Sequence, residues 1–283
     1  MARASRDARM SGAAVAAPGD GPVWTSAGGV DVWARAGALA ALALAWEAVG
    51  RGARFAFLPP LTSVLVALWE LVADGEILGS LAPSLVSLLI GYALAAGLGL
   101  ALGALMGRRP SLDHMLDPCV SAMLAAPNLA FVPILAALLG AGRATQVAVV
   151  FLYAFFLVTA TTAAAFRMAD ASLIDMARSL GAAERQLFWK VLVPGSAPMV
   201  FAGLRIGMVR AVKGMVGGEM LVAASGLGAL ARVYGSRFDA ERALAVLLVV
   251  TLVALAGAEL IRTLEPRVVE RKSRDQRARL ASP

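Results

Sequence analysis

Six long apolar segments constrain this chain more than any other feature. They are separated by short polar stretches and cover residues 34–50, 82–106, 116–140, 145–166, 197–223 and 243–263. A helix of about 20 residues spans the roughly 30 Å hydrocarbon core of a bilayer. The sequence therefore predicts an all-α membrane protein with about six transmembrane helices, of which the first is the shortest.

The composition agrees with a bilayer as the solvent for most of the chain. Hydrophobic residues make up 59% of the sequence, charged residues 16%, and the mean hydropathy is +0.76, above what a water-soluble domain presents. The single cysteine, Cys119, excludes an intrachain disulfide framework. The single histidine, His114, argues against a histidine-rich metal site or a histidine-based catalytic relay. We expect no metal ion and no catalytic residue.

The basic residues predict the orientation of the chain. The net charge of +7 could indicate nucleic acid, but the basic residues lie at segment ends and in the tails, where lipid contact and topology account for them. If the amino end is inside, most of the 26 Lys and Arg residues are cytoplasmic, and those outside are Arg51, Arg54, Arg143, Arg232, Arg237 and Arg242. We therefore expect a multi-pass protein with the N-terminus and C-terminus both cytoplasmic, bound to membrane lipid and to no nucleic acid.

Composition also divides the chain along its length. Residues 1–32 are rich in Ala, Gly, Ser and Arg and predict a disordered cytoplasmic N-terminal arm. A cleaved signal peptide is a poor alternative, because no apolar stretch follows the first arginines. Residues 33–265 form the predicted transmembrane domain, and residues 266–283 form a basic cytoplasmic tail.

A polar segment at residues 174–194 interrupts the apolar pattern on the predicted cytoplasmic face, between the fourth and fifth spans. Apolar residues recur there at helical spacing, and charged residues mark the opposite face. Gly181 separates two short helices, and Pro194 is expected to stop the second helix and to start the turn into the fifth span. An amphipathic, charge-bearing element in this position is typical of a docking site for a soluble partner.

The spacing of this segment resembles the cytoplasmic coupling loop of binding-protein-dependent ABC importer permeases. The loose consensus of that loop is Glu-Ala-Ala, three residues, Gly, nine residues, Ile, one residue, Leu-Pro. Every interval is kept here, at Asp175, Met176, Ala177, Gly181, Val191, Val193 and Pro194. The departures are Asp for Glu, Met for the first Ala, and Val for both Ile and Leu. By this resemblance the residues that couple the chain to an ATPase are Asp175, Ala177, Gly181, Val191 and Pro194.

The resemblance extends over roughly residues 40–265. Segments that look like the nitrate, sulfonate, taurine and bicarbonate branch of these permeases are Trp46-Glu47, residues 57–69, Pro127, Pro133, residues 203–207, residues 218–221 and residues 225–228. In that family two permease subunits pair in the membrane, ATP-binding cassette ATPase subunits bind the coupling loops, and an extracytoplasmic solute-binding protein delivers the substrate. The resemblance implies a type I ABC importer permease fold in the plasma (inner) membrane, a homodimer, and a small anionic solute.

The chain carries no phosphate-binding loop, because no Gly-x-x-x-x-Gly-Lys-Ser/Thr stretch occurs in it. We expect no cofactor in this chain and a non-catalytic role, with ATP bound and hydrolysed by a partner subunit. The resemblance implies that closure of the ATPases moves the coupling loop as a lever and reorients the pathway.

Ionisable residues within the fifth span are candidates for the pathway, because such groups tend to face a bundle interior or an aqueous cavity. Arg210 and Lys213 share one helix face and would attract an anion. Alternatively, they are solvated or pair with Glu219 of a second copy. Glu219 is itself either a buried structural acid at the dimer interface or a polar residue of the gate. The small residues of the second span could line a pore, but they are expected to serve close helix packing. They are Gly91, Ala95, Gly97, Gly99 and Gly103.

Two other classes of membrane protein, secondary transporters and intramembrane enzymes, would require different sequence features. A secondary transporter working without an ATPase would normally show discontinuous helices and inverted repeats, which the sequence does not reveal. An intramembrane enzyme would need a Ser-His, paired Asp or His-x-x-x-His arrangement, and none occurs within the spans. The segment at residues 223–242 is expected outside the membrane, either as a re-entrant turn or as a plain connecting loop.

Overall fold

The structure is a computed structural model that describes residues 30–52, 58–169 and 171–280. Every regular element in these ranges is a helix, which confirms the all-α class. The helices are α1 (Val30–Gly52), α2 (Leu61–Ala73), α3 (Glu76–Arg108), α4 (Pro110–Ala125), a 3₁₀ turn (Asn128–Phe131), α5 (Val132–Leu139), α6 (Arg143–Arg167), α7 (Ala171–Ser179), α8 (Glu184–Leu187), a π-helical turn (Phe188–Leu192), α9 (Val193–Val222), α10 (Leu227–Ser236) and α11 (Ala240–Leu280).

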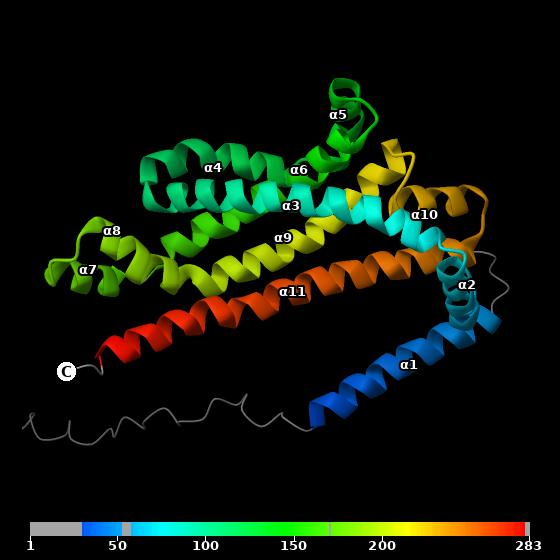
Figure 1. Ribbon diagram of the computed structural model, residues 1–283, viewed down its shortest axis with the longest axis horizontal. Coiled ribbons are helices and arrows are strands. Elements are labelled where there is room, and N and C mark those ends of the chain that lie inside the picture. Colours follow the sequence, from blue (N-terminus) through cyan, green and yellow to red (C-terminus); the bar gives the residue numbers. More distant parts are fainter. Residues whose placement is uncertain (1–29, 53–57, 170, 281–283) are drawn as a thin grey trace, which may run out of the picture.

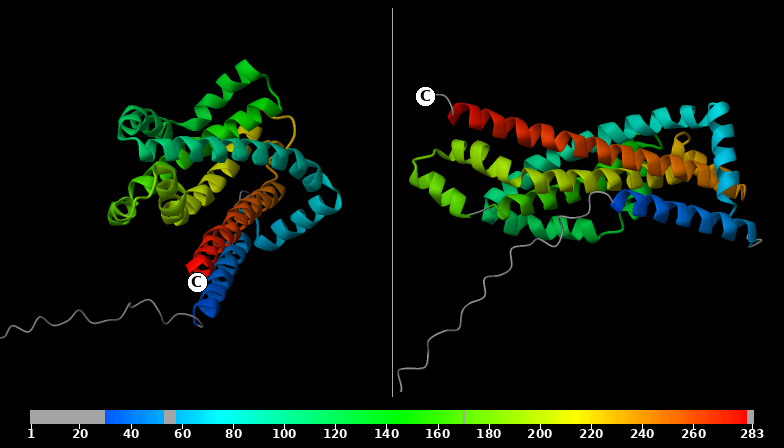
Figure 2. Two further views of the ribbon diagram at one scale, coloured as in Figure 1. Left: turned by 60° about the vertical axis from the view of Figure 1, so that its left-hand side comes forward. Right: turned by 90° about the horizontal axis from the view of Figure 1, so that it is seen from below.

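Three long helices, α3, α6 and α9, form the centre of the bundle, and α11 runs along α9 (Figures 1 and 2). The core between them contains Tyr92, Val150, Ala154 and Met215, all at most 9% exposed. The Tyr92 hydroxyl donates a hydrogen bond of 2.8 Å to the backbone carbonyl of Leu204 and so ties α3 to α9. Such a bond contributes to helix association in a membrane, because the hydrophobic effect does not drive helices together in lipid.

Most of the glycines predicted to serve helix packing in α3 do so, but Gly97 does not, because a Cβ added there would meet nothing within 4 Å. A Cβ atom added at Gly91 would lie 2.7 Å from the Val150 side chain, and one added at Gly103 would lie 2.5 Å from the backbone oxygen of Thr159. Both contacts are with α6. The absence of a side chain therefore lets the backbones of α3 and α6 approach each other closely.

Four helices in the described part of the chain are long and apolar enough to cross a membrane: α3, α6, the run Glu184–Val222 and the first part of α11, Ala240–Glu265. They contain the predicted spans at 82–106, 145–166, 197–223 and 243–263. The predicted first span, 34–50, lies in the helix α1, which is not one of these four and whose described side chains are mostly exposed. The count of six spans therefore stays a prediction.

The predicted third span, residues 116–140, is not one straight helix. It is divided into α4 and the segment Asn128–Leu139, which meet at an angle of 91° and together provide a fifth candidate span. The break lies at Ala126, whose ψ of 145° is extended. A residue that precedes proline is disfavoured in the helical conformation, so Pro127 accounts for the end of α4.

Hydrogen bonds between α1 and the start of α2 give a structural role to the Trp46-Glu47 motif and to the segment 57–69 that follows it. The Trp46 indole N–H donates a hydrogen bond of 3.1 Å to the carbonyl of Pro59, and the Glu47 carboxylate accepts bonds from the backbone N–H and the hydroxyl of Thr62 at 3.0 and 2.9 Å. Glu47 thereby binds an N–H group in the first turn of α2 that has no partner within the helix. The end of α1 is thus fastened to the start of α2.

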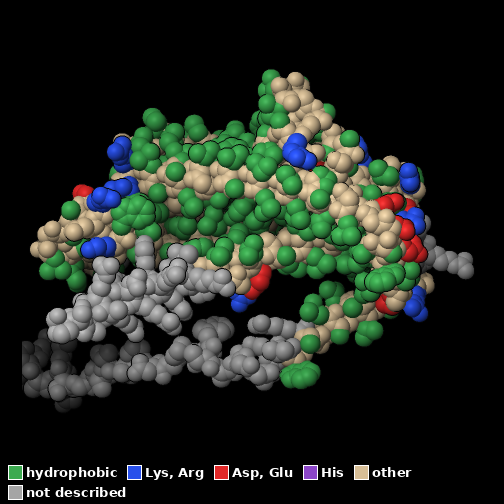
Figure 3. All heavy atoms as spheres, in the orientation of Figure 1, with side chains coloured by type: hydrophobic (Ala, Val, Ile, Leu, Met, Phe, Trp, Pro, Cys, Tyr) green, Lys and Arg blue, Asp and Glu red, His purple; other side chains and the backbone are tan. Residues whose placement is uncertain are grey.

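Charged side chains gather at the two ends of the bundle, and the surface between them is mainly apolar (Figure 3). One end carries α7, α8 and the carboxyl ends of α3 and α6, and the other end carries α2 and α10 (Figure 1). This arrangement suits a protein whose middle lies in hydrocarbon and whose ends lie in water.

Candidate functional site at the α7–α8 end

The segment between α6 and α9 folds as a helix, a glycine turn and a second helix, as predicted. The N–H of Gly181 donates to the carbonyl of Arg178 at 2.9 Å, and the N–H of Ala182 donates to the carbonyl of Ala177 at 3.0 Å. These two bonds form the Schellman motif that ends many helices. Gly181 has a φ of +77°, and a Cβ added there would meet nothing within 4 Å. Its backbone conformation, rather than crowding, is what favours glycine.

The second half of the turn is held by polar side chains at the surface. Gln186 accepts a hydrogen bond from the N–H of Ala183 at 3.1 Å, which orders the first turn of α8. Arg178 of α7 forms an ion pair with Glu184 of α8 at 3.3 Å, and both side chains are more than half exposed. Exposed pairs of this kind stabilise by less than about 1 kcal/mol, so this pair orients the two helices without locking them.

Large apolar side chains are exposed on this hairpin. Leu173 is 50% exposed, Met176 59%, Leu180 82% and Trp189 55%. Three of them lie in or directly after α7, which stands at the extreme end of the bundle (Figure 1). A cluster of exposed apolar residues among charged ones marks an interaction site.

The five predicted coupling residues occupy different settings. Asp175 lies exposed on α7, Ala177 is half-buried on the same helix, and Gly181 forms the turn. Val191 is half-buried in the π-helical turn, where it lines a cavity of about 280 Å³ together with Leu173, Ser196 and Met199.

The prediction that Pro194 stops the second helix and starts a turn is wrong. Pro194 is the second residue of α9, and the helical run continues from Glu184 through it to Val222. A proline in a helix lacks an N–H and crowds the carbonyl four residues earlier. Here the widened π-helical turn Phe188–Leu192 directly precedes α9, so the local helix geometry changes where the proline requires it. The hairpin and the fifth span therefore form one continuous rod.

Phe188 anchors this rod to the bundle, a role that the sequence reasoning missed. Its ring stacks on Phe166 of α6 with centroids 5.8 Å apart, and the guanidinium carbon of Arg108, at the end of α3, lies 4.4 Å from its centroid. Leu187, the neighbouring residue, is only 2% exposed. The signal available in the sequence was the adjacent aromatic pair Phe188-Trp189 within a segment that also carries charged residues.

The amino end of α4 and the carboxyl end of α6 are joined beside this contact. Arg167 forms an ion pair with Asp113, which is largely buried, and lies 3.8 Å from the more exposed Asp117. The other Asp113 oxygen, Oδ1, has no hydrogen-bond partner in the described part of the chain. This ion pair thus fastens α4 to α6 at the end of the bundle that carries the hairpin.

The candidate pathway residues of α9 lie apart from the hairpin and differ in exposure. Lys213 is exposed, Arg210 is half-buried and Glu219 is completely buried. Glu219 accepts hydrogen bonds from Ser84 of α3 and from the backbone of Gly228, and neither Arg210 nor Lys213 forms an ion pair with it among the described residues. Oε2 of Glu219 therefore has its hydrogen-bond partners within a single chain, whereas Oε1 has none among the described residues. A role of these residues in a pathway stays a prediction.

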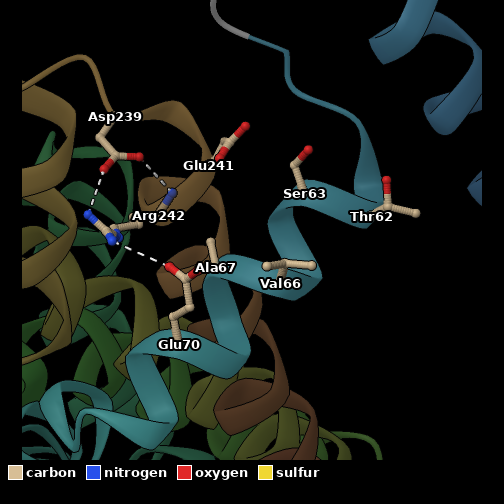
Figure 4. Close-up of a pocket in the computed structure, with 8 residues that line it drawn as sticks. All are labelled: Thr62, Ser63, Val66, Ala67, Glu70, Asp239, Glu241 and Arg242. Carbon is tan, nitrogen blue, oxygen red and sulfur yellow. Dashed lines mark hydrogen bonds and ion pairs between the residues drawn. The ribbon is translucent and has the colours of Figure 1, made fainter.

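The opposite end of the bundle carries a polar cavity of about 440 Å³ between α2 and the start of α11. Arg242 reaches across it, 3.4 Å from Glu70 of α2 and 3.4 Å from Asp239 (Figure 4). Residues 223–242, predicted as a re-entrant turn or a plain loop, contain the helix α10, which packs against α3, α9 and α11.

A bundle of long apolar helices with an exposed, charged hairpin at one end defines a helical membrane protein. The chain belongs to the family of binding-protein-dependent transport system inner membrane components, whose model matches residues 95–270. It is a permease subunit of an ABC importer, and the alternatives of a secondary transporter and an intramembrane enzyme are set aside.

Relatives of known description agree with this family. The chain is 29% identical over 217 residues to the taurine transport system permease protein TauC of Escherichia coli (strain K12), covering 75% of this chain and 79% of that protein. It is 32% identical over 171 residues to the putative aliphatic sulfonates transport permease protein SsuC of Bacillus subtilis (strain 168), covering 60% of this chain and 62% of that protein. It is 30% identical over 145 residues to the nitrate import permease protein NrtB of Synechocystis sp., covering 51% of this chain and 53% of that protein.

A solved structure supports the fold. A chain of the MetNI methionine ABC transporter, in an inward-facing conformation, is similar with a TM-score of 0.55 and 23% identity over 72% of this chain and 96% of that one. The likeness confirms the type I ABC importer permease fold.

Proposed function

We propose that the α7–α8 hairpin is the docking site for an ATP-binding cassette ATPase subunit, and that this subunit binds and hydrolyses ATP while the present chain is non-catalytic. The observation that carries the proposal is the exposed apolar set Leu173, Met176 and Leu180, which lies along α7 and at the turn that follows it. The hairpin continues through the π-helical turn into α9. A partner that grips the hairpin would therefore move a membrane-spanning helix directly.

The docking proposal assigns an orientation. The α7–α8 end lies in the cytoplasm, where ATP is, and both chain termini are on that side. Basic residues at the ends of α3 and α6, Arg108, Arg109 and Arg167, agree with the excess of Lys and Arg expected on that face. The opposite end, with α2, α10 and the polar cavity around Arg242, then faces the extracytoplasmic solute-binding protein. A second copy of the permease completes the pathway.

The transported solute is a small anion of the sulfonate, taurine or nitrate class. The relatives that transport taurine, aliphatic sulfonates and nitrate support this class by their descriptions. Arg210 and Lys213 would attract such an anion to α9. Binding of candidate anions to the purified solute-binding protein, measured by thermal shift, tests the class.

The docking site is tested by co-purification of the ATPase with the variant Gly181→Asp. Gly75 offers a matched control, because it has the same φ of +77° and the same empty surroundings but lies between α2 and α3 at the opposite end. We expect Gly181→Asp to reach the membrane and to lose the ATPase and transport, and Gly75→Asp to retain the ATPase. Normal uptake into vesicles by the Gly181 variant would overturn the docking site.

A further inference from the structure

The carboxyl end of α9 is attached to α10 through one buried carboxylate. Glu219 is 0% exposed. Its Oε2 accepts a hydrogen bond of 2.8 Å from the backbone N–H of Gly228 and one of 2.9 Å from the hydroxyl of Ser84, while Oε1 has no hydrogen-bond partner in the described part of the chain. The Ser84 oxygen in turn accepts the N–H of Leu227 at 2.9 Å. Two amide groups in the first turn of α10 thus depend on Glu219 and Ser84, and they have no partners within α10 itself.

The glycines of the Ser-Gly-Leu-Gly motif allow this approach. A Cβ atom added at Gly226 would lie 2.5 Å from the carboxyl carbon of Glu219, and one added at Gly228 would lie 2.5 Å from the backbone oxygen of Val216. Gly226 also has a φ of +113°, which side chains rarely permit. The motif therefore seats the start of α10 directly against the last turns of α9.

The far end of α10 is attached to the same helix, α3. The Tyr234 hydroxyl donates a hydrogen bond of 2.5 Å to Glu76, at the start of α3. Glu76 and Ser84 are separated by about 12 Å along α3 at 1.5 Å per residue. Leu227, 0% exposed, packs between these points with residues of α2 and α11. The helix α10 is therefore hydrogen-bonded to α3 near both of its ends and to α9 at its first turn.

Glu219 also stands at one end of the rod that begins in the docking hairpin. The helical run from Glu184 to Val222 has 39 residues, which corresponds to about 58 Å at 1.5 Å per residue. The end of this rod in the hairpin would contact the ATPase. The end that carries Glu219 contacts α10. One helix therefore connects the two ends of the molecule.

We propose that Glu219 is a positioning residue that fastens α10 to α9, so that a solute-binding protein docked on the α10 end changes the ATPase rate through this rod. The inference rests on the proposed function for the meaning of the two ends. Two hydrogen bonds converge on one oxygen of Glu219, so this side chain holds both Ser84 of α3 and the Gly228 N–H of α10. The helix α9 that carries it runs without a break from Val193 to Val222. Loss of the carboxylate would leave α9 and α10 packed but not fastened.

The test uses the complete complex in lipid nanodiscs, with and without loaded solute-binding protein, and the variants Glu219→Ala, Glu219→Gln and Ser84→Ala. Amide hydrogen exchange in residues 223–236 reports the attachment, and the ratio of stimulated to basal ATPase rate reports the coupling. In Glu219→Ala we expect about tenfold faster exchange at Gly228, whose N–H loses its acceptor, as for the loss of one hydrogen bond. We also expect faster exchange at Leu227 and a stimulation ratio near one. Glu219→Gln, which keeps an acceptor oxygen, should recover most of both. Ser236→Ala, on an exposed part of the same helix, is the control and should resemble the unaltered complex.

Unchanged exchange in Glu219→Ala, or faster exchange with a full stimulation ratio, would overturn the proposal. Should Glu219→Ala fail to assemble, Ser84→Ala decides, because it removes one hydroxyl from the same attachment and should give the same changes at smaller size. An unaltered chain that never binds an ATPase would instead refute the proposed function. Exchange at Leu227 and Gly228 in the isolated chain would still show whether Glu219 holds α10.

Discussion

Arg108 and Phe188 meet where the docking hairpin joins the bundle, with the guanidinium carbon of Arg108 4.4 Å from the centre of the Phe188 ring. Arg108 is the last residue of α3, and Phe188 follows α8. The Phe188 ring also stacks on the ring of Phe166 in α6. One aromatic side chain therefore links the hairpin to two spans at once.

Replacing Phe188 by alanine should weaken this link without removing the docking surface. We expect the ATPase to remain bound to Phe188→Ala, transport per ATP hydrolysed to fall severalfold, and stability to fall by about 1–3 kcal/mol, since a partly buried aromatic residue and a cation–π contact are lost. Transport and ATP hydrolysis measured together in proteoliposomes check this. Phe188→Tyr keeps the ring and should behave almost normally; an equally impaired tyrosine variant would speak against the ring contacts.

Close packing of α3 on α6 should make Gly103 intolerant of even one methyl group. A Cβ at Gly103 would lie 2.5 Å from a backbone oxygen of α6, whereas one at Gly97 of the same helix would meet nothing within 4 Å. We expect Gly103→Ala to lower stability by about 1–3 kcal/mol, because backbone must shift, and Gly97→Ala to be neutral or slightly stabilising. Thermal unfolding of the two purified variants in detergent checks the difference, and equal melting temperatures would contradict it.

Removing one charge of the Arg167–Asp113 ion pair should lower stability more than removing both charges. Replacing Arg167 by glutamine leaves a largely buried carboxylate without its cation, which we expect to cost about 1–3 kcal/mol after allowance for the partly exposed arginine. The double variant Arg167→Gln, Asp113→Asn removes both charges and should recover part of that loss. A double-mutant cycle from chemical or thermal unfolding gives the coupling energy, and a value near zero would contradict the pairing.

Tyr234 should stay protonated far above neutral pH. Burial, with the hydrogen bond to Glu76, raises the pKa of Tyr234 to about 12. A raised pKa means that the folded chain favours the protonated form, so this contribution to stability is complete below about pH 10 and is lost as the pH rises toward 12. We expect an alkaline absorbance titration of the folded chain to lose one late-titrating tyrosine in Tyr234→Phe. Disappearance of an ordinary tyrosine instead would contradict the burial.

The docking hairpin was predictable in detail because its determinants are local. Gly181 needs a left-handed backbone and marks the turn, and the 3.6-residue spacing of apolar side chains marks the helices on either side. Pro194 misled the prediction, since proline usually breaks a helix and nothing in the sequence announces a π-helical turn before it. At Pro127 the error was the opposite one. The apolar residues continue through this position, so the sequence predicted one continuous span where the structure has a break.

The sequence by itself determined the helical class, the apolar segments, the hairpin and, through the spacing of the hairpin, the family of the protein. These features depend on periodicity and on backbone preferences that act within a few residues. Only the tertiary structure decided that Glu219 binds the start of α10, that Phe188 joins the hairpin to α3 and α6, and which glycines of α3 lie against α6. Such contacts join residues as far apart as Ser84 and Glu219, and their partners follow from how the helices pack, which spacing along one helix does not specify.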